Sequence, residues 1–206
     1  MPQFNGIDFS ALCSLRPRPL IMTGVFRDIL MRHFADPDLI EEPDLRKLIW
    51  KPGQDTGILL ESSTRWRPEL TQFRPGVILK RNAYANVRKG IDDRRQGPAD
   101  ILGNDHHVTY WTGSHTLFCI ARTGAQVELL GSEVQRELTQ FGPAMREVLA
   151  LLKFRVTELG AIAKLEESQE NWVVPVTVGY AYEERWVIRP EAPRLSHLSL
   201  SLINEC

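Results

Sequence analysis

The spacing of apolar residues predicts a helix in the first part of the chain. Between positions 20 and 34, apolar side chains recur at steps of four, as in Phe26, Leu30 and Phe34. This period is typical of a helix that buries one face, and Pro37 marks its end. We expect this first helix to be well buried.

A second helix is predicted from Gly124. Thr123 and Gln126 have the spacing of a capping box, in which their side chains satisfy free amides of the first turn. We expect Gly142-Pro143 to interrupt this helix and restart it, because proline is tolerated at a first helical position. The buried stripe is expected at Val127, Leu130, Val134 and Leu138, with Glu128, Glu133, Arg136 and Glu137 turned elsewhere.

The remaining apolar residues alternate with polar ones or form short runs, which is typical of strands. Thr112-Gly113-Ser114 predicts a hairpin turn between two of them, and Pro175, which lacks an amide donor, predicts an edge position or a bulge. The pattern therefore predicts an α+β fold, with a mainly antiparallel sheet packed against two main helices. The candidate strands are 48–50, 57–61, 77–81, 107–111, 115–121, 154–159 and 172–182.

Residues 82–105 have no hydrophobic period and predict a long inserted loop or arm. The segment has few apolar groups to offset its ordering entropy, and its positive and negative charges cancel. We expect it to contact a neighbouring subunit or ring, and a surface loop without a partner is the alternative. The candidate subunit-interface residues are Arg88, Lys89, Asp92, Asp93, Arg94 and Arg95.

Length and composition are those of one globular domain. The chain has 206 residues, of which 43% are hydrophobic and 25% are charged. We expect a single domain over 1–206, with residues 1–19 as an N-terminal extension. No apolar run is long enough to span a bilayer, and no run of Lys and Arg exceeds two residues. The sequence thus predicts neither membrane insertion nor sequence-specific binding of nucleic acid.

Residues that could carry chemistry do not form a recognisable catalytic motif. Asp105, His106, His107 and His115 are the nearest approach to a metal site, but adjacent strand residues point to opposite faces. Cys119 lies among apolar residues, which favours a buried, unreactive thiol. Phosphate-binding glycine loops and the serine nucleophile elbow do not occur. We therefore expect no catalytic, cofactor-binding or metal site, and a protein that is not an enzyme.

The order of these elements is similar to that of a known class of proteins. After the opening helix come 57–61 with Trp66-Arg67-Pro68, and then 74–81. A loop, a Gly-Ser-His hairpin that runs into the long helix of 126–138, and a closing valine-rich strand follow. Over most of residues 20–190 this pattern resembles the tail terminator and neck proteins of tailed bacteriophages.

The resemblance implies a structural virion protein located in the neck or tail and made in the host cytoplasm. Such a subunit forms a homo-oligomeric ring, commonly a hexamer, that caps the tail tube and joins it to the head-side connector. Its partners are then the tail tube protein and the connector protein, and DNA has room to pass through the ring lumen. Two alternatives remain: a head-completion (stopper) or adaptor protein of the neck, and a small enzyme centred on the His106, His107 and His115 hairpin.

Overall fold

The structure is a computed structural model that describes residues 18–53, 56–88, 104–166 and 168–188. By their internal contacts the residues divide into two compact units. Unit 1 comprises Met1–Ala85 and Thr112–Tyr182, and unit 2 comprises Asn86–Trp111 and Glu183–Cys206. The predicted extension 1–19 lies outside the described residues up to position 17.

The first predicted helix is confirmed as α1 (Pro19–Ala35). Pro19 occupies a first-turn position, where a missing amide hydrogen costs no helical bond. The helix ends before Asp36, which is extended because Pro37 disfavours a helical conformation in the residue before it. Two short 3-10 helices follow, η1 (Pro37–Leu39) and η2 (Pro43–Leu45). The buried apolar side chains of α1 are Met22, Val25, Phe26, Ile29, Leu30 and Phe34.

The second predicted helix is α2 (Gly124–Val148), and the hydroxyl of Thr123 accepts a hydrogen bond from the Gln126 amide at 3.3 Å. The predicted interruption at Gly142-Pro143 is wrong, because the helix continues through both residues. Pro143 removes one backbone bond near the helix end, while Gly142 packs towards the Phe154 ring and Met145 is buried. Among the described residues, neither helix is long and apolar enough to cross a membrane. The predicted stripe of Val127, Leu130, Val134 and Leu138 is fully buried.

The strands form one mostly antiparallel sheet of seven, so the α+β fold is confirmed. Its main path runs β1-β2-β4-β7-β5, with β3 paired to β4 and β6 paired to β7. β1 and β2 are parallel, and residues 63–75, which contain η3 (Pro68–Thr71), connect them. The strands are β1 (Leu59–Ser62), β2 (Gly76–Arg81), β3 (Ala85–Asn86), β4 (Asp105–Ala121), β5 (Leu151–Leu159), β6 (Ala163–Leu165) and β7 (Ser168–Ile188).

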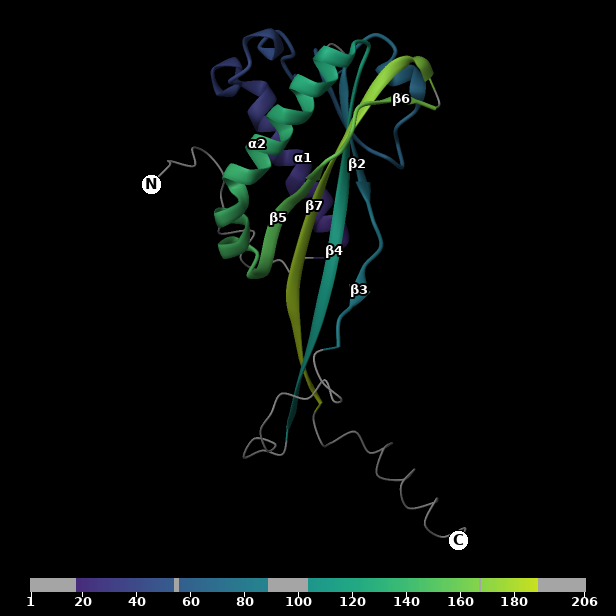
Figure 1. Cartoon of the computed structure of the whole chain (residues 1–206). Helices are drawn as coiled ribbons and strands as arrows, with labels where there is room; N and C mark the ends of the chain where they lie inside the picture. Colours follow the sequence, from purple (N-terminus) through teal and green to yellow (C-terminus); the bar gives the residue numbers. More distant parts are fainter. Residues whose placement is uncertain (1–17, 54–55, 89–103, 167, 189–206) are drawn as a thin grey trace, which may run out of the picture. The chain divides into compact units, whose positions relative to one another are not determined.

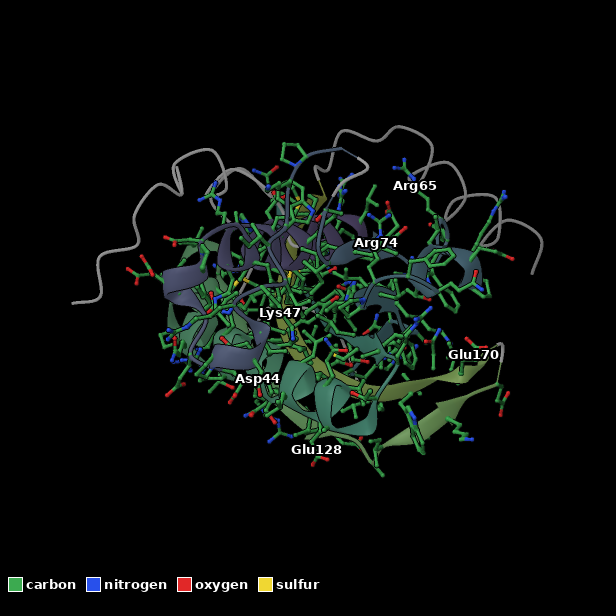
Figure 2. All side chains as sticks on the ribbon, turned by 90° about the horizontal axis from the view of Figure 1, so that it is seen from above. Asp44, Lys47, Arg65, Arg74, Glu128 and Glu170 are labelled. Atoms are coloured by element: carbon green, nitrogen blue, oxygen red, sulfur yellow. The ribbon has the colours of Figure 1, made fainter. Side chains whose placement is uncertain are left out.

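Within unit 1, both helices cover the same face of the sheet (Figure 1). α1 packs against β1 and β2, and α2 packs against β5. Alternate residues of the central strands, such as Leu117 and Cys119 of β4 and Val176 of β7, complete this core. Charged side chains such as Asp44, Arg65 and Glu128 lie around its periphery (Figure 2). Burial raises the pKa of the Cys119 thiol, as predicted for an unreactive cysteine.

The predicted hairpin at Thr112-Gly113-Ser114 is wrong, because β4 runs as one strand from Asp105 to Ala121. Its second half pairs antiparallel with β2, from Arg81 opposite His115 to Gly76 opposite Ile120. Gly113 serves close packing instead of a turn: a β-carbon there would clash with the ring of Tyr84.

The edge position predicted for Pro175 is also wrong, since β7 lies between β4 and β5 in the sheet. The predicted alternative was a bulge, and the pairing is irregular at this point. β5 ends with Leu159 opposite Val176 and β6 begins with Ala163 opposite Val173, so the three residues 160–162 lie opposite only two residues, 174–175. The Gly160 amide donates to the Pro175 carbonyl at 2.8 Å, and a β-carbon at Gly160 would overlap the proline ring. Proline is therefore tolerated inside the sheet because its neighbour is interrupted there.

The segment 48–50 was predicted to be a strand and is not one. Its backbone makes isolated contacts: Trp50 donates to the Phe34 carbonyl, and Gly57 donates to the Ile49 carbonyl, each at 2.8 Å. These single hydrogen bonds satisfy backbone groups without the repeated pairing of a strand. A short apolar run alone therefore does not distinguish a strand from a buried loop.

Candidate functional site

The predicted interface segment is described only at its two ends. Arg88 is exposed and follows β3, whose neighbour Val87 donates a backbone hydrogen bond to Tyr110 at 2.8 Å. The predicted loop 82–105 therefore begins with a short strand. Lys89, Asp92, Asp93, Arg94 and Arg95 lie outside the described residues, so their interface role stays a prediction.

The three histidines of the predicted hairpin have different surroundings. In unit 2, the His107 ring stacks on Trp186 with centroids 4.3 Å apart, and His106 is exposed. His115 belongs to unit 1 and is fully buried. Within the described ranges, no group of three or more His, Cys, Asp or Glu residues is arranged to hold a metal ion. Because β4 does not fold back, the hairpin on which the enzyme hypothesis was centred does not exist.

His115 lies in a chain of hydrogen bonds that links the sheet to α1. Its Nε2 is 2.8 Å from the Thr23 hydroxyl, and its Nδ1 is 3.0 Å from the Tyr180 hydroxyl. Thr23 donates its own hydrogen to the Pro19 carbonyl at 3.1 Å, so it can only accept from His115. His115 therefore carries its hydrogen on Nε2, and Nδ1 accepts from Tyr180. Tyr84 completes the chain by donating to the Tyr180 oxygen at 2.5 Å.

The electrostatics keep every member of this chain neutral. Burial, together with Arg81 opposite on β2, lowers the pKa of His115 to about 4. Burial raises the pKa of Tyr84 to about 12 and raises that of Tyr180 as well. A neutral imidazole with both nitrogens occupied is a poor general base, because neither nitrogen is free to take a substrate proton. The arrangement is suited to holding α1 on the sheet.

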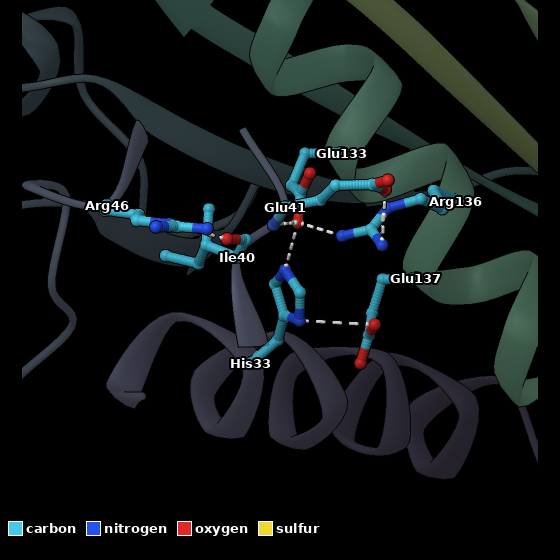
Figure 3. A network of polar contacts seen from close by, with 7 residues as sticks. All are labelled: His33, Ile40, Glu41, Arg46, Glu133, Arg136 and Glu137. Atoms are coloured by element: carbon cyan, nitrogen blue, oxygen red, sulfur yellow. Dashed lines mark hydrogen bonds and ion pairs between the residues drawn. The ribbon is translucent and has the colours of Figure 1, made fainter. Parts of the chain in front are cut away.

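A second buried polar cluster joins α1 to α2 (Figure 3). His33 Nε2 lies 2.8 Å from Glu133 Oε1, and His33 Nδ1 lies 3.2 Å from Glu137 Oε2 without the alignment of a hydrogen bond. Arg136 bridges outward, with 2.5 Å from its Nη2 to Glu133 Oε1 and 2.6 Å from its Nη1 to Glu41 Oε2. Two buried carboxylates thus face one imidazole and one guanidinium, which ties both helices to the segment that follows α1.

The sequence interpretation missed this cluster, because it turned Glu133 and Glu137 away from the core. Both are buried, at 4% and 7% exposure. A signal was present: His33 continues the apolar face of α1 four residues after Ile29, and Glu133 follows Leu130 by three. Polar residues of complementary type at the borders of two apolar stripes indicate a buried pair between helices.

Comparisons with known proteins add no relative to these observations. No protein-family model matches the chain, and no curated protein matches it in sequence.

Proposed function

We propose that this chain is a structural subunit of the neck of a tailed bacteriophage, a tail-terminator-like protein that forms a ring. In this role the ring caps the tail tube and joins it to the head-side connector. The observation that carries the proposal is the order of elements: α1, the β1–β2 pair, the segment before β4, α2, and the closing strands β5 and β7. This order agrees with the resemblance except at the expected hairpin, where β4 is one continuous strand. The resemblance also implies a sheet packed against two helices, which the fold has.

The use of the buried polar groups supports a structural role. His115 links the sheet to α1, and His33 links α1 to α2, so both buried histidines serve to fix the layers. The same fold is compatible with a head-completion or adaptor role. In that role the subunit would bind a different neighbouring ring of the neck.

Imaging tests this proposal. Negative-stain class averages of the purified full-length chain, alone and in the assembled particle, should show closed rings of about six copies. A strict monomer in both settings would overturn the proposal. A ring found at the connector end and not against the tail tube would assign the stopper or adaptor role instead.

A further inference from the structure

The connection between β1 and β2 exposes a large aromatic side chain among arginines. Phe73 is 83% exposed and Leu70 is 38% exposed. Arg122 is held beside Phe73: its guanidinium lies 6.0 Å from the ring centroid, and its Nε donates to the Gln72 carbonyl at 2.9 Å. Aromatic and arginine side chains are enriched at the centres of protein interfaces. We call Arg65, Arg67, Leu70, Phe73 and Arg122 the arginine patch. Glu69 is also exposed within this connection, so three arginines and one glutamate give the surface a net charge of +2.

The segment that follows α1 has the opposite charge. Residues 36–44 contain five acidic residues and no Lys or Arg, and Leu39 among them is 53% exposed. Arg136 pairs with Glu41, whereas no other acidic residue of the segment forms an ion pair within the part of the chain that the structure describes. We call Asp36, Asp38, Leu39, Glu42 and Asp44 the acidic patch.

Local contacts hold the acidic patch in one conformation. The Asp36 carboxylate caps η1 by accepting from the Asp38 amide at 3.0 Å, and Arg46 donates to the Ile40 carbonyl at 3.0 Å. Ile40 and Leu45 are fully buried beneath it. A preformed surface loses little conformational entropy when a partner binds.

The two patches lie apart on unit 1. In Figure 2, Asp44 and Arg65 are on different sides of the unit, and in Figure 1 the segment after α1 and the connection before β2 are also on different sides. They therefore do not cover each other within one chain. A two-fold contact that paired the patches would have to present both patches of one copy to the same partner, which patches on different sides of the unit do not allow. Complementary patches at separate places on one chain favour head-to-tail contacts, which close into rings or extend into filaments.

We propose that the arginine patch of one copy binds the acidic patch of the next copy, with Phe73 and Leu70 packed against Leu39. This inference rests on the proposed ring and names the surfaces that build it. The apolar side chains supply the buried centre of the contact, and the charges around them set its direction.

Charge reversal tests the pairing. The variant Arg65→Glu/Arg67→Glu and the variant Asp38→Lys/Asp44→Lys should each weaken self-association by about tenfold or more, as measured by sedimentation across concentration. An equimolar mixture should restore assembly, because each reversed patch then meets a patch of opposite charge. The control Glu128→Lys/Glu170→Lys changes exposed residues outside both patches and should assemble as the unchanged chain does.

The outcomes separate this inference from the proposed function. Unfolding curves of all variants should match, since the altered side chains are exposed. Reversed variants that still assemble, or a mixture that stays monomeric, would overturn the pairing and leave the ring proposal standing. An unchanged chain that is monomeric at every concentration would also overturn the pairing, and imaging of the particle would then decide the ring.

Discussion

At the scale of single residues, His115 shows how a potentially catalytic side chain is used as a structural link. Its two ring nitrogens are bonded to Thr23 and Tyr180, on α1 and β7. Each hydrogen bond satisfies a buried polar atom, and leaving that atom without a partner would lower the unfolding free energy by about 1–3 kcal/mol. The direction of the hydrogen bonds requires the neutral ring.

This neutral state makes stability depend on pH. The pKa of His115 falls from the ordinary 6.5 to about 4 on folding, so the unfolded chain binds more protons between these values. The free energy of unfolding should therefore decrease as pH falls from about 6.5, by about 3 kcal/mol in all once pH is below 4. Urea titrations from pH 7 to 4 should show this decrease in the unchanged chain.

A matched pair of variants isolates the contribution of His115. His115→Gln should lose this part of the pH dependence, whereas His106→Gln, at an exposed position, should retain it. If the unfolding free energy of His115→Gln depended on pH in the same way as that of the unchanged chain, the neutral buried ring would be contradicted.

The buried cluster around His33 leads to a separate prediction. His33→Ala removes the partner that Glu133 and Glu137 share, while Glu133 keeps Arg136, and should cost about 1–3 kcal/mol of unfolding free energy. Adding Glu137→Gln should recover part of the loss, because an uncharged amide costs less to bury than a carboxylate that has lost its partner. Chemical denaturation of the three proteins measures this. A loss below about 1 kcal/mol for His33→Ala would show that the cluster is not a stabilising link.

At the scale of elements, the sequence predicted those with a regular apolar pattern. It did not predict the local structure at residues that interrupt the pattern, such as Gly113 and Pro175. Both helices were predictable, because their stripes have a clear period and their ends carry Pro37 or Thr123. Strand β2 was predictable from a short apolar run, and β5 from the alternation of apolar and polar residues. The functional interpretation of the histidines depended on a hairpin, and that hairpin depended on Gly113 alone.

Glycine is ambiguous in a single sequence, since turns and close packing both require it. At Gly113 the deciding factor is Tyr84, which comes from a distant part of the sequence and packs where a β-carbon would be. Pro175 is similar, because its place inside the sheet depends on the break between β5 and β6. Such tertiary effects leave no signal within a local window of sequence.

The packing of Gly160 on Pro175 can be tested directly. Gly160→Ala places a β-carbon against the proline ring and should destabilise the protein by about 1–3 kcal/mol. The control Gly24→Ala lies on an exposed helical position with free space around it, and should stabilise by about 0.5–1 kcal/mol. Thermal unfolding measures both changes. No destabilisation in Gly160→Ala would contradict the account of how β7 accommodates proline.

At the scale of the whole molecule, the charged segment after β3 is proposed to act between subunits. Replacing residues 89–100 with a Gly/Ser linker keeps β3 and removes Lys89, Asp92, Asp93, Arg94 and Arg95. We expect nearly unchanged melting of the isolated subunit and impaired assembly, since the paired charges suit a complementary surface. Loss of folding would place the segment in the subunit core, and normal assembly would show that it has no role between copies.

We propose that this chain is a ring subunit that works as an assembly. The mass of the full-length protein in solution, measured by light scattering across a range of concentrations, tests the claim most directly. One chain weighs 23.5 kDa, so a ring of six copies would weigh 6 × 23.5, or about 141 kDa. We predict one closed species near that mass, with no growth at higher concentration because a closed ring has no free contacts. A mass that stays at 23.5 kDa at every concentration, together with a monomer in the assembled particle, would contradict the account.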